Sequence, residues 1–148
     1  MRRNAVHITR ETDYALRALR SLIDGEKKKL DSICEEEHVP KQFGYKILKK
    51  LAHAEYVRIV RGKEGGYIIN EAMLDKSLYD LTEAMENDPD ISPCLQDSYS
   101  CEYRNDKHGC CGVHDKLAAL QEKIDGELKA INLKSLLSDD TVDDDAAD

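Results

Sequence analysis

Apolar side chains recur at helical intervals in the first part of the chain. Between Thr9 and Asp24, aliphatic residues fall within about a third of a helical wheel drawn at ~100° per residue. They are Ala15, Leu16, Leu19, Leu22 and Ile23. The pattern predicts an amphipathic helix, which Thr9 or Thr12 can cap and the Asp24-Gly25 pair ends. Asp13 lies on its polar side, where a first-turn carboxylate interacts favourably with the helix dipole.

Two more helices are predicted on either side of Val39-Pro40. The first is short, from Ser32 to His38, and Cys34 lies on its apolar side as a small core residue. The residue before a proline avoids the helical conformation, so this helix ends there. Pro40 is well placed to begin the next helix, which runs to Ala54.

The helix from Pro40 to Ala54 has two distinct sides. Its apolar residues are Phe43, Ile47, Leu48, Leu51 and Ala54, and its cationic or hydrogen-bonding residues are Gln42, Tyr45, Lys46, Lys49 and His53. Such a polar side can simply be solvated. A short helix, a tight turn and an amphipathic helix with a free cationic side nevertheless form the pattern of a helix-turn-helix.

A β-hairpin is predicted directly after this motif. Tyr56 to Val60 and Tyr67 to Asn70 are short β-type runs, and the segment between them, 61–66, is rich in glycine and carries Arg61 and Lys63. A hairpin in this position is a wing. The glycines do not form a nucleotide-binding loop, because the GK[ST] signature is missing and a strand follows.

The remaining chain is predicted to be mostly helical. Met73 to about Glu86 forms one helix, and 115–132 forms a long helix with Leu117, Leu120, Ile124, Leu128 and Ile131 at coiled-coil-like spacing. This narrow apolar stripe needs a partner, for which a second copy of the chain is the simplest choice. A short helical turn, Leu133 to Leu137, precedes an acidic tail, 138–148, that is predicted to be disordered.

Composition adds a charge asymmetry to this picture. Of the 148 residues, 35% are charged, and the net charge of −8 combines +5 over residues 1–70 with −13 over residues 71–148. The basic half is suited to a polyanion. No apolar run reaches the ~20 residues of a membrane span, and the N-terminus lacks the apolar stretch of a signal peptide, so a cytoplasmic location is expected.

Four of the five cysteines lie between positions 94 and 111, and His114 follows. We call residues 94–114 the cysteine segment. It contains almost no aliphatic residues, so the burial of apolar side chains cannot hold its shape and another interaction must do so. Thiolates and an imidazole at these spacings bind zinc or the iron of iron-sulfur clusters. Disulfides, or a thiol redox function involving Cys101, Cys110 and Cys111, are alternatives, but clustered cysteines in the cytoplasm more often bind metal.

The chain resembles the IscR and NsrR family of bacterial winged-helix transcription regulators up to about Leu137. The resemblance is carried by ITRETDYALRAL (8–19), VPKQFGYKILKKLAHAEYV (39–57), VRGKEGGY (60–67) and CCGVH (110–114), with Cys94 and Cys101. It implies a homodimer, paired through the 115–132 helix, that binds palindromic promoter DNA. It also implies an iron-sulfur cluster in the cysteine segment.

The resemblance also implies cluster ligands. Cys94, Cys101, Cys111 and His114 match the ligands of a 2Fe-2S cluster in the IscR type. In the NsrR type, which holds a 4Fe-4S cluster, a carboxylate of the other subunit is the fourth ligand, and Asp13 occupies that position. The gaps between the cysteines exceed those usual in the family, and Cys110 is an alternative third thiolate.

The DNA-contacting residues follow in the same way. Gln42, Tyr45 and Lys46 match the part of the recognition helix that reads base edges. Arg61 and the Gly65-Gly66 turn match the wing, which implies a minor-groove contact. Lys41, Lys49 and Lys63 are assigned to phosphates.

Together these patterns predict a mainly α fold in four parts. Residues 1–86 form a winged helix-turn-helix domain, 87–114 a cluster-binding loop, 115–137 a dimerisation helix with its terminal turn, and 138–148 the acidic tail. The expected function is that of a non-enzymatic transcription regulator, a repressor that senses redox, iron or nitric oxide status. A cluster-free regulator and a zinc-binding module remain alternatives.

Overall fold

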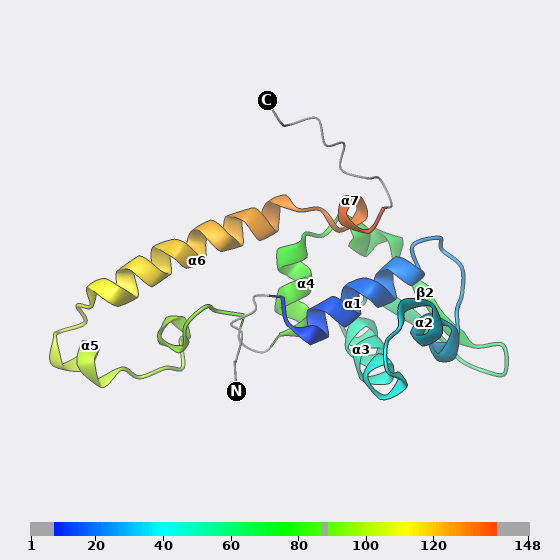
Figure 1. Cartoon of the computed structure of the whole chain (residues 1–148), viewed down its shortest axis with the longest axis horizontal. Coiled ribbons are helices and arrows are strands. Elements are labelled where there is room, and N and C mark those ends of the chain that lie inside the picture. The colour runs from blue at the N-terminus through cyan, green and yellow to red at the C-terminus, as the bar shows by residue number, and fades with distance from the viewer. Residues whose placement is uncertain (1–7, 87–88, 139–148) are drawn as a thin grey trace, which may run out of the picture.

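The computed structural model describes residues 8–86 and 89–138, so all but the first residue of the tail predicted for 138–148 lies outside the described residues. Three helices form the first part of the fold: α1 (Arg10–Ser21), α2 (Leu30–Glu37) and α3 (Lys41–His53) (Figure 1). Each lies within three residues of its predicted bounds. Thr9 is the N-cap residue of α1, but neither its side chain nor that of Thr12 caps the helix; both hydroxyls donate to the Glu86 carboxylate instead.

A tight turn joins α2 to α3. His38 ends α2 in the left-handed conformation, with φ of 53°, and Pro40 is the N-cap residue of α3. The two helices come very close where Gly44 of α3 faces Cys34 of α2, because a Cβ at Gly44 would lie only 2.4 Å from the Cys34 Sγ. Cys34 is buried there, as predicted.

The wing is a two-stranded antiparallel hairpin. β1 (Val57–Val60) pairs with β2 (Gly66–Ile69) in a register that sets Val57 opposite Ile69 and Val60 opposite Gly66. Between the strands, Gly62 has φ of +106°, a conformation that glycine adopts without strain. Lys28, before α2, adds an isolated bridge to Tyr67 and so ties the wing to the helices.

The helix predicted from Met73 to Glu86 is two helices. A 3₁₀ helix, η1 (Glu71–Asp75), is followed by α4 (Leu78–Met85). The break has a local cause: Ser77 and Asp80 form a capping box, in which the Ser77 hydroxyl accepts from the Asp80 amide and the Asp80 carboxylate accepts from the Ser77 amide.

The second half of the chain leaves the body of the molecule and returns to it. It contains η2 (Pro93–Leu95), α5 (Glu102–Asp106), α6 (Gly112–Ala130) and α7 (Leu133–Leu137). Figure 1 shows α6 and the cysteine segment as an arm that extends to one side of α1–α4. α6 begins three residues before its predicted start because Cys111 serves as its N-cap residue.

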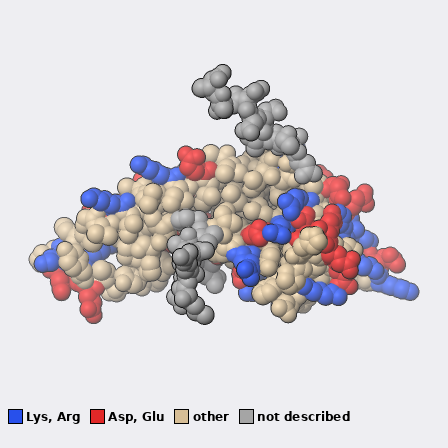
Figure 2. Space-filling model, in the orientation of Figure 1, with Lys and Arg blue, Asp and Glu red and all other residues tan. Residues whose placement is uncertain are grey.

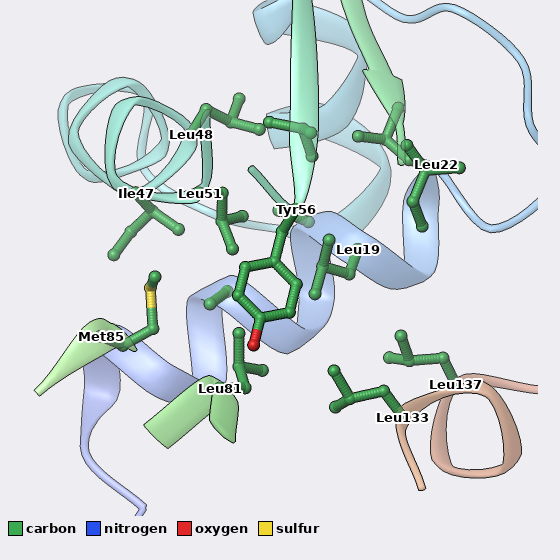
Figure 3. Close-up of a cluster of buried hydrophobic side chains, with 14 of the residues drawn as sticks. Leu19, Leu22, Ile47, Leu48, Leu51, Tyr56, Leu81, Met85, Leu133 and Leu137 are labelled. Carbon is green, nitrogen blue, oxygen red and sulfur yellow. The ribbon is translucent and has the colours of Figure 1, made fainter. Parts of the chain in front are cut away.

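The core lies between the helices of the winged-helix domain and includes α7 (Figure 3). Leu133 and Leu137 join the buried cluster formed by α1, α3 and α4, which includes Leu19, Leu48 and Leu81. α6, in contrast, contains no buried residue in one subunit. Among the described residues, no helix is long and apolar enough to cross a membrane.

One residue of α3 differs from the prediction. Phe43, which the pattern places on the apolar side, is 40% exposed, because it lies at the margin between the buried and outward sides of α3. The fold as a whole is the predicted one: mainly helical, with a two-stranded wing and a long C-terminal helix.

Candidate nucleic-acid interface and cysteine site

The outward side of α3 carries residues predicted to contact DNA bases or phosphates. Gln42, Tyr45, Lys46 and Lys49 are all exposed. The exposed fraction of Tyr45 is 57%. The opposite side, which contains Ile47 and other aliphatic residues, is buried in the core, so α3 is held firmly while its polar side stays accessible.

Several cations of α3 are paired with carboxylates of neighbouring helices. Glu11 of α1 accepts from Lys46 at 2.7 Å and also from Lys50, and Lys41 pairs with Asp31 of α2 at 2.6 Å. The hydrogen bonds from Lys46 and Lys50 lower the pKa of the Glu11 carboxyl, and the bond to Asp31 raises the pKa of Lys41. The cationic face is therefore partly neutralised, and DNA phosphates would compete with Glu11 and Asp31.

The wing presents further cations. Arg61 and Lys63 are exposed at its tip, as predicted, and Arg58 is exposed on β1. Arg58 is not among the residues predicted to contact DNA, although alternation along the strand from the buried Val57 places it on the outward side. Figure 2 shows acidic and basic side chains intermingled over the helical body in that view.

The cysteine segment forms a hollow of about 620 Å³. Its lining includes all four predicted ligands: Cys94, Cys101, Cys111 and His114. Cys110 is exposed and does not line it. Two cations, Arg104 and Lys116, also line the hollow and would offset the negative charge of thiolates. Sequence reasoning missed these two residues, for which only their closeness to the cysteines was a signal.

Local structure positions each donor. Cys94 lies in η2, where its Sγ is 3.3 Å from the Ser92 hydroxyl, and Cys101 is the N-cap residue of α5. The Cys111 Sγ accepts from the His114 backbone amide at 3.5 Å at the start of α6. The His114 Nδ1 atom is buried without a hydrogen-bond partner. A buried imidazole nitrogen in this state is costly unless something binds it.

The donors share a hollow but do not converge. Within residues 8–86 and 89–138, no three His, Cys, Asp or Glu side chains lie close enough together to hold a metal ion. The five cysteines are all free thiols. The structure thus assembles the donor set around one space and leaves the thiols unjoined.

Asp13 lies away from this hollow. It pairs with Arg17 at 3.2 Å and faces a different hollow, of about 310 Å³, between α1 and the end of α7. Within one subunit, Asp13 and the cysteine segment are therefore separate.

Polar contacts tie the end of α4 to α1 and α3. The Glu86 carboxylate accepts from the hydroxyls of Thr9 and Thr12, the latter at 2.6 Å. Lys50 of α3 donates to the Met85 carbonyl at 3.0 Å as well as to Glu11. The chain thus leaves toward the cysteine segment from a point bonded to both α1 and α3.

Comparison with known proteins identifies the family. The Rrf2 family model, described as an iron-dependent transcriptional regulator, matches residues 8–139. The chain belongs to the Rrf2 family. An Rrf2-like HTH-type transcriptional regulator of Rhodobacter capsulatus is 29% identical over 127 residues, which cover 82% of this chain and 80% of the relative. Rrf2 regulators bind DNA and typically act as dimers.

Solved structures of Rrf2-type regulators share the fold. IscR of T. potens has a TM-score of 0.61 at 22% identity, covering 87% of this chain and 84% of IscR. CymR of Staphylococcus aureus has a TM-score of 0.64 at 22% identity, covering 88% and 97% of the two chains. A transcriptional regulator of Listeria innocua has a TM-score of 0.69 at 19% identity, covering 95% and 92%. These likenesses confirm the winged-helix fold.

Proposed function

We propose that this Rrf2 regulator senses its signal through an iron-sulfur cluster held in the cysteine segment. The observation that carries the proposal is the hollow into which Cys94, Cys101, Cys111 and His114 are gathered, with the His114 Nδ1 buried and unpartnered. Three thiolates and one imidazole nitrogen suit a 2Fe-2S cluster. Such a cluster supplies reversible one-electron chemistry and reactivity toward oxidants and nitric oxide.

The structure also supports a choice between the two adjacent cysteines. Cys111 lines the hollow and Cys110 does not, which favours Cys111 as the third thiolate. Asp13 is the alternative fourth ligand, for a 4Fe-4S cluster. Since it does not line the hollow of its own subunit, it would have to act on the cysteine segment of a second subunit.

A homodimer paired through α6 is the second part of the proposal. Val113 and Leu120 of α6 and Ile131, the C-cap residue of this helix, are exposed apolar side chains, and another side of α6 packs on α4. Exposed apolar side chains of this kind are stabilised when a second α6 covers them. Two winged-helix domains related by a two-fold axis would then meet palindromic half-sites one helical turn of DNA apart, ~34 Å, or a multiple of it.

Signal transfer follows from the contacts at the end of α4. A change in the shape of the cysteine segment reaches Met85 and Glu86 first, and these residues are bonded to Lys50 of α3 and to Thr9 and Thr12 of α1. The recognition helix would shift with them. A tenfold change in DNA affinity needs a difference of only ~1.4 kcal/mol between the two states.

Anaerobic reconstitution of the full-length chain with iron and sulfide tests the cluster. We expect a brown protein with visible absorption and with iron and sulfide in equal amounts. Cys111→Ala should abolish the colour and Cys110→Ala should retain it, which makes the second variant a matched control. Mössbauer spectroscopy would count the irons and distinguish a nitrogen or oxygen ligand from sulfur. A colourless protein containing stoichiometric zinc would contradict the proposal.

A regulator without a cluster is the second candidate. It is favoured by the separation of the donors, since no three of them converge in the described ranges. One structural neighbour, CymR of B. subtilis, is described as a global cysteine regulator. If this candidate is correct, Cys111→Ala should bind DNA as the unchanged protein does, with or without iron and sulfide.

A further inference from the structure

Phe43 is the single phenylalanine of the chain, and it lies in the first turn of α3 with a large part of its surface exposed. Its ring is nevertheless held in place. The ring centroid lies 5.8 Å from that of Tyr14 on α1, with an angle of 43° between the planes, a separation typical of favourable aromatic pairs. α1 thus supports one side of an aromatic ring that α3 presents at its N-terminal end.

The position of the ring indicates which part of a bound DNA duplex it would contact. N-terminal residues of a recognition helix approach base edges in the major groove. A phenylalanine side chain has no hydrogen-bonding group, so it can distinguish bases only through apolar contact. In the major groove, the apolar group that differs between bases is the 5-methyl group of thymine.

The neighbouring cations would not detect a methyl group, because an ammonium group recognises hydrogen-bond acceptors and negative charge. Lys46 is engaged with Glu11 and Lys41 with Asp31, and a lysine released from such a pair is drawn to any phosphate. An exposed ring held by Tyr14, beside cations that are already paired, points to apolar reading of the sequence.

We propose that Phe43 is a specificity-determining residue that packs against the 5-methyl group of a thymine in each half-site. The inference rests on the proposed DNA-binding function and extends it to one base. Covering a single methyl group by the ring is expected to change the affinity about fourfold per half-site.

Deoxyuridine scanning tests the contact. The full-length protein first selects a duplex from a randomised library, and that duplex is the probe. Each thymine of a half-site is then replaced by deoxyuridine, which removes only the methyl group. We expect one position at which the affinity falls about fourfold. Phe43→Ala should bind the original duplex more weakly and lose its sensitivity at that position, as in a double-mutant cycle.

Matched variants keep the test decisive. Tyr99→Ala removes an exposed aromatic ring from the cysteine segment and should leave the deoxyuridine effect unchanged. Phe43→Leu retains an apolar side chain and should keep part of the deoxyuridine effect. This variant takes the place of Phe43→Ala if the alanine variant does not fold. A scan without any sensitive position, or equal sensitivity in Phe43→Ala, overturns the inference while DNA binding stands. Selection of no preferred duplex overturns the DNA-binding proposal together with it.

Discussion

Gly44 lies where α3 packs closely against α2, so a substitution there should change the distance between the two helices. It lies on the buried side of α3, and an added Cβ would be 2.4 Å from the Cys34 Sγ and 3.3 Å from the Leu30 Cδ1. Alanine at a helical position gains up to ~1 kcal/mol over glycine, whereas overpacking a core costs ~1–3 kcal/mol. We therefore predict that Gly44→Ala lowers the free energy of unfolding by up to ~2 kcal/mol.

The sulfur atom that causes the clash can be removed. Cys34→Ala alone should cost ~1 kcal/mol, because it leaves a small cavity. In the double variant, the alanine methyl at position 44 occupies part of that space, so the two changes should compensate. We expect a coupling energy of ~1–3 kcal/mol from urea denaturation followed by circular dichroism. The protein concentration must be held fixed, since association contributes to stability.

Gly126→Ala is the matched control for this experiment. It makes the same chemical change within α6, where nothing beyond the adjacent residues and the nearby backbone of α6 itself lies within 4 Å of the added Cβ. It should stabilise the protein by ~0.5–1 kcal/mol. If Gly44→Ala behaves like Gly126→Ala, or if its effect adds to that of Cys34→Ala without coupling, the close approach of the two helices is not what requires glycine at position 44.

Three further predictions concern charges. Glu11→Gln should destabilise the protein at neutral pH but not in acid. Hydrogen bonds from Lys46 and Lys50 lower the pKa of the Glu11 carboxyl, so the stability that it contributes is lost as the pH falls through that lowered pKa. Urea midpoints measured across pH test this, and a difference between the two proteins that does not change with pH would contradict it. Glu86→Gln should cost ~1 kcal/mol through its weakened bonds to two hydroxyls, whereas Glu83→Gln, at an exposed position of α4, should cost little in the same urea titrations. Lys63→Ala should reduce the slope of log affinity against log salt by ~0.9 in binding titrations, and an unchanged slope would argue against a phosphate contact by Lys63 of the wing.

The periodicity of apolar residues was sufficient to predict the long helices, but it failed where hydrogen bonds of single side chains determine where a helix begins. The helices α1, α3 and α6 and both strands follow from apolar spacing and glycine positions. The break before α4 depends on Ser77 and Asp80, whose capping signature is short and easily overlooked within an apolar run. The helical wheel assigns Phe43 to the apolar side of α3, but a wheel does not show where the buried surface of a helix ends, and here Tyr14 of α1 pairs with the ring at that margin.

The candidate site likewise has features that could be predicted from the sequence and features that could not. Residue types and the family resemblance predicted the cysteines and His114 that line the hollow. The buried, unpartnered Nδ1 of His114 and the bond between Thr12 and Glu86 could not be predicted. The latter joins residues 74 positions apart, and such contacts depend on how helices pack and not on any local pattern.

The return of the chain at α7 makes the arm formed by the cysteine segment and α6 an insertion between two parts of one folded unit. The chain departs after Met85 and comes back where Leu78 donates to the Ile131 carbonyl and Leu133 donates to the Lys76 carbonyl. Leu133 and Leu137 then complete the core. A DNA-binding fragment cut after α4 would therefore lack part of its own interior. Chimeras that exchange residues 89–131 for the arm of another regulator, and keep α7, would preserve that interior.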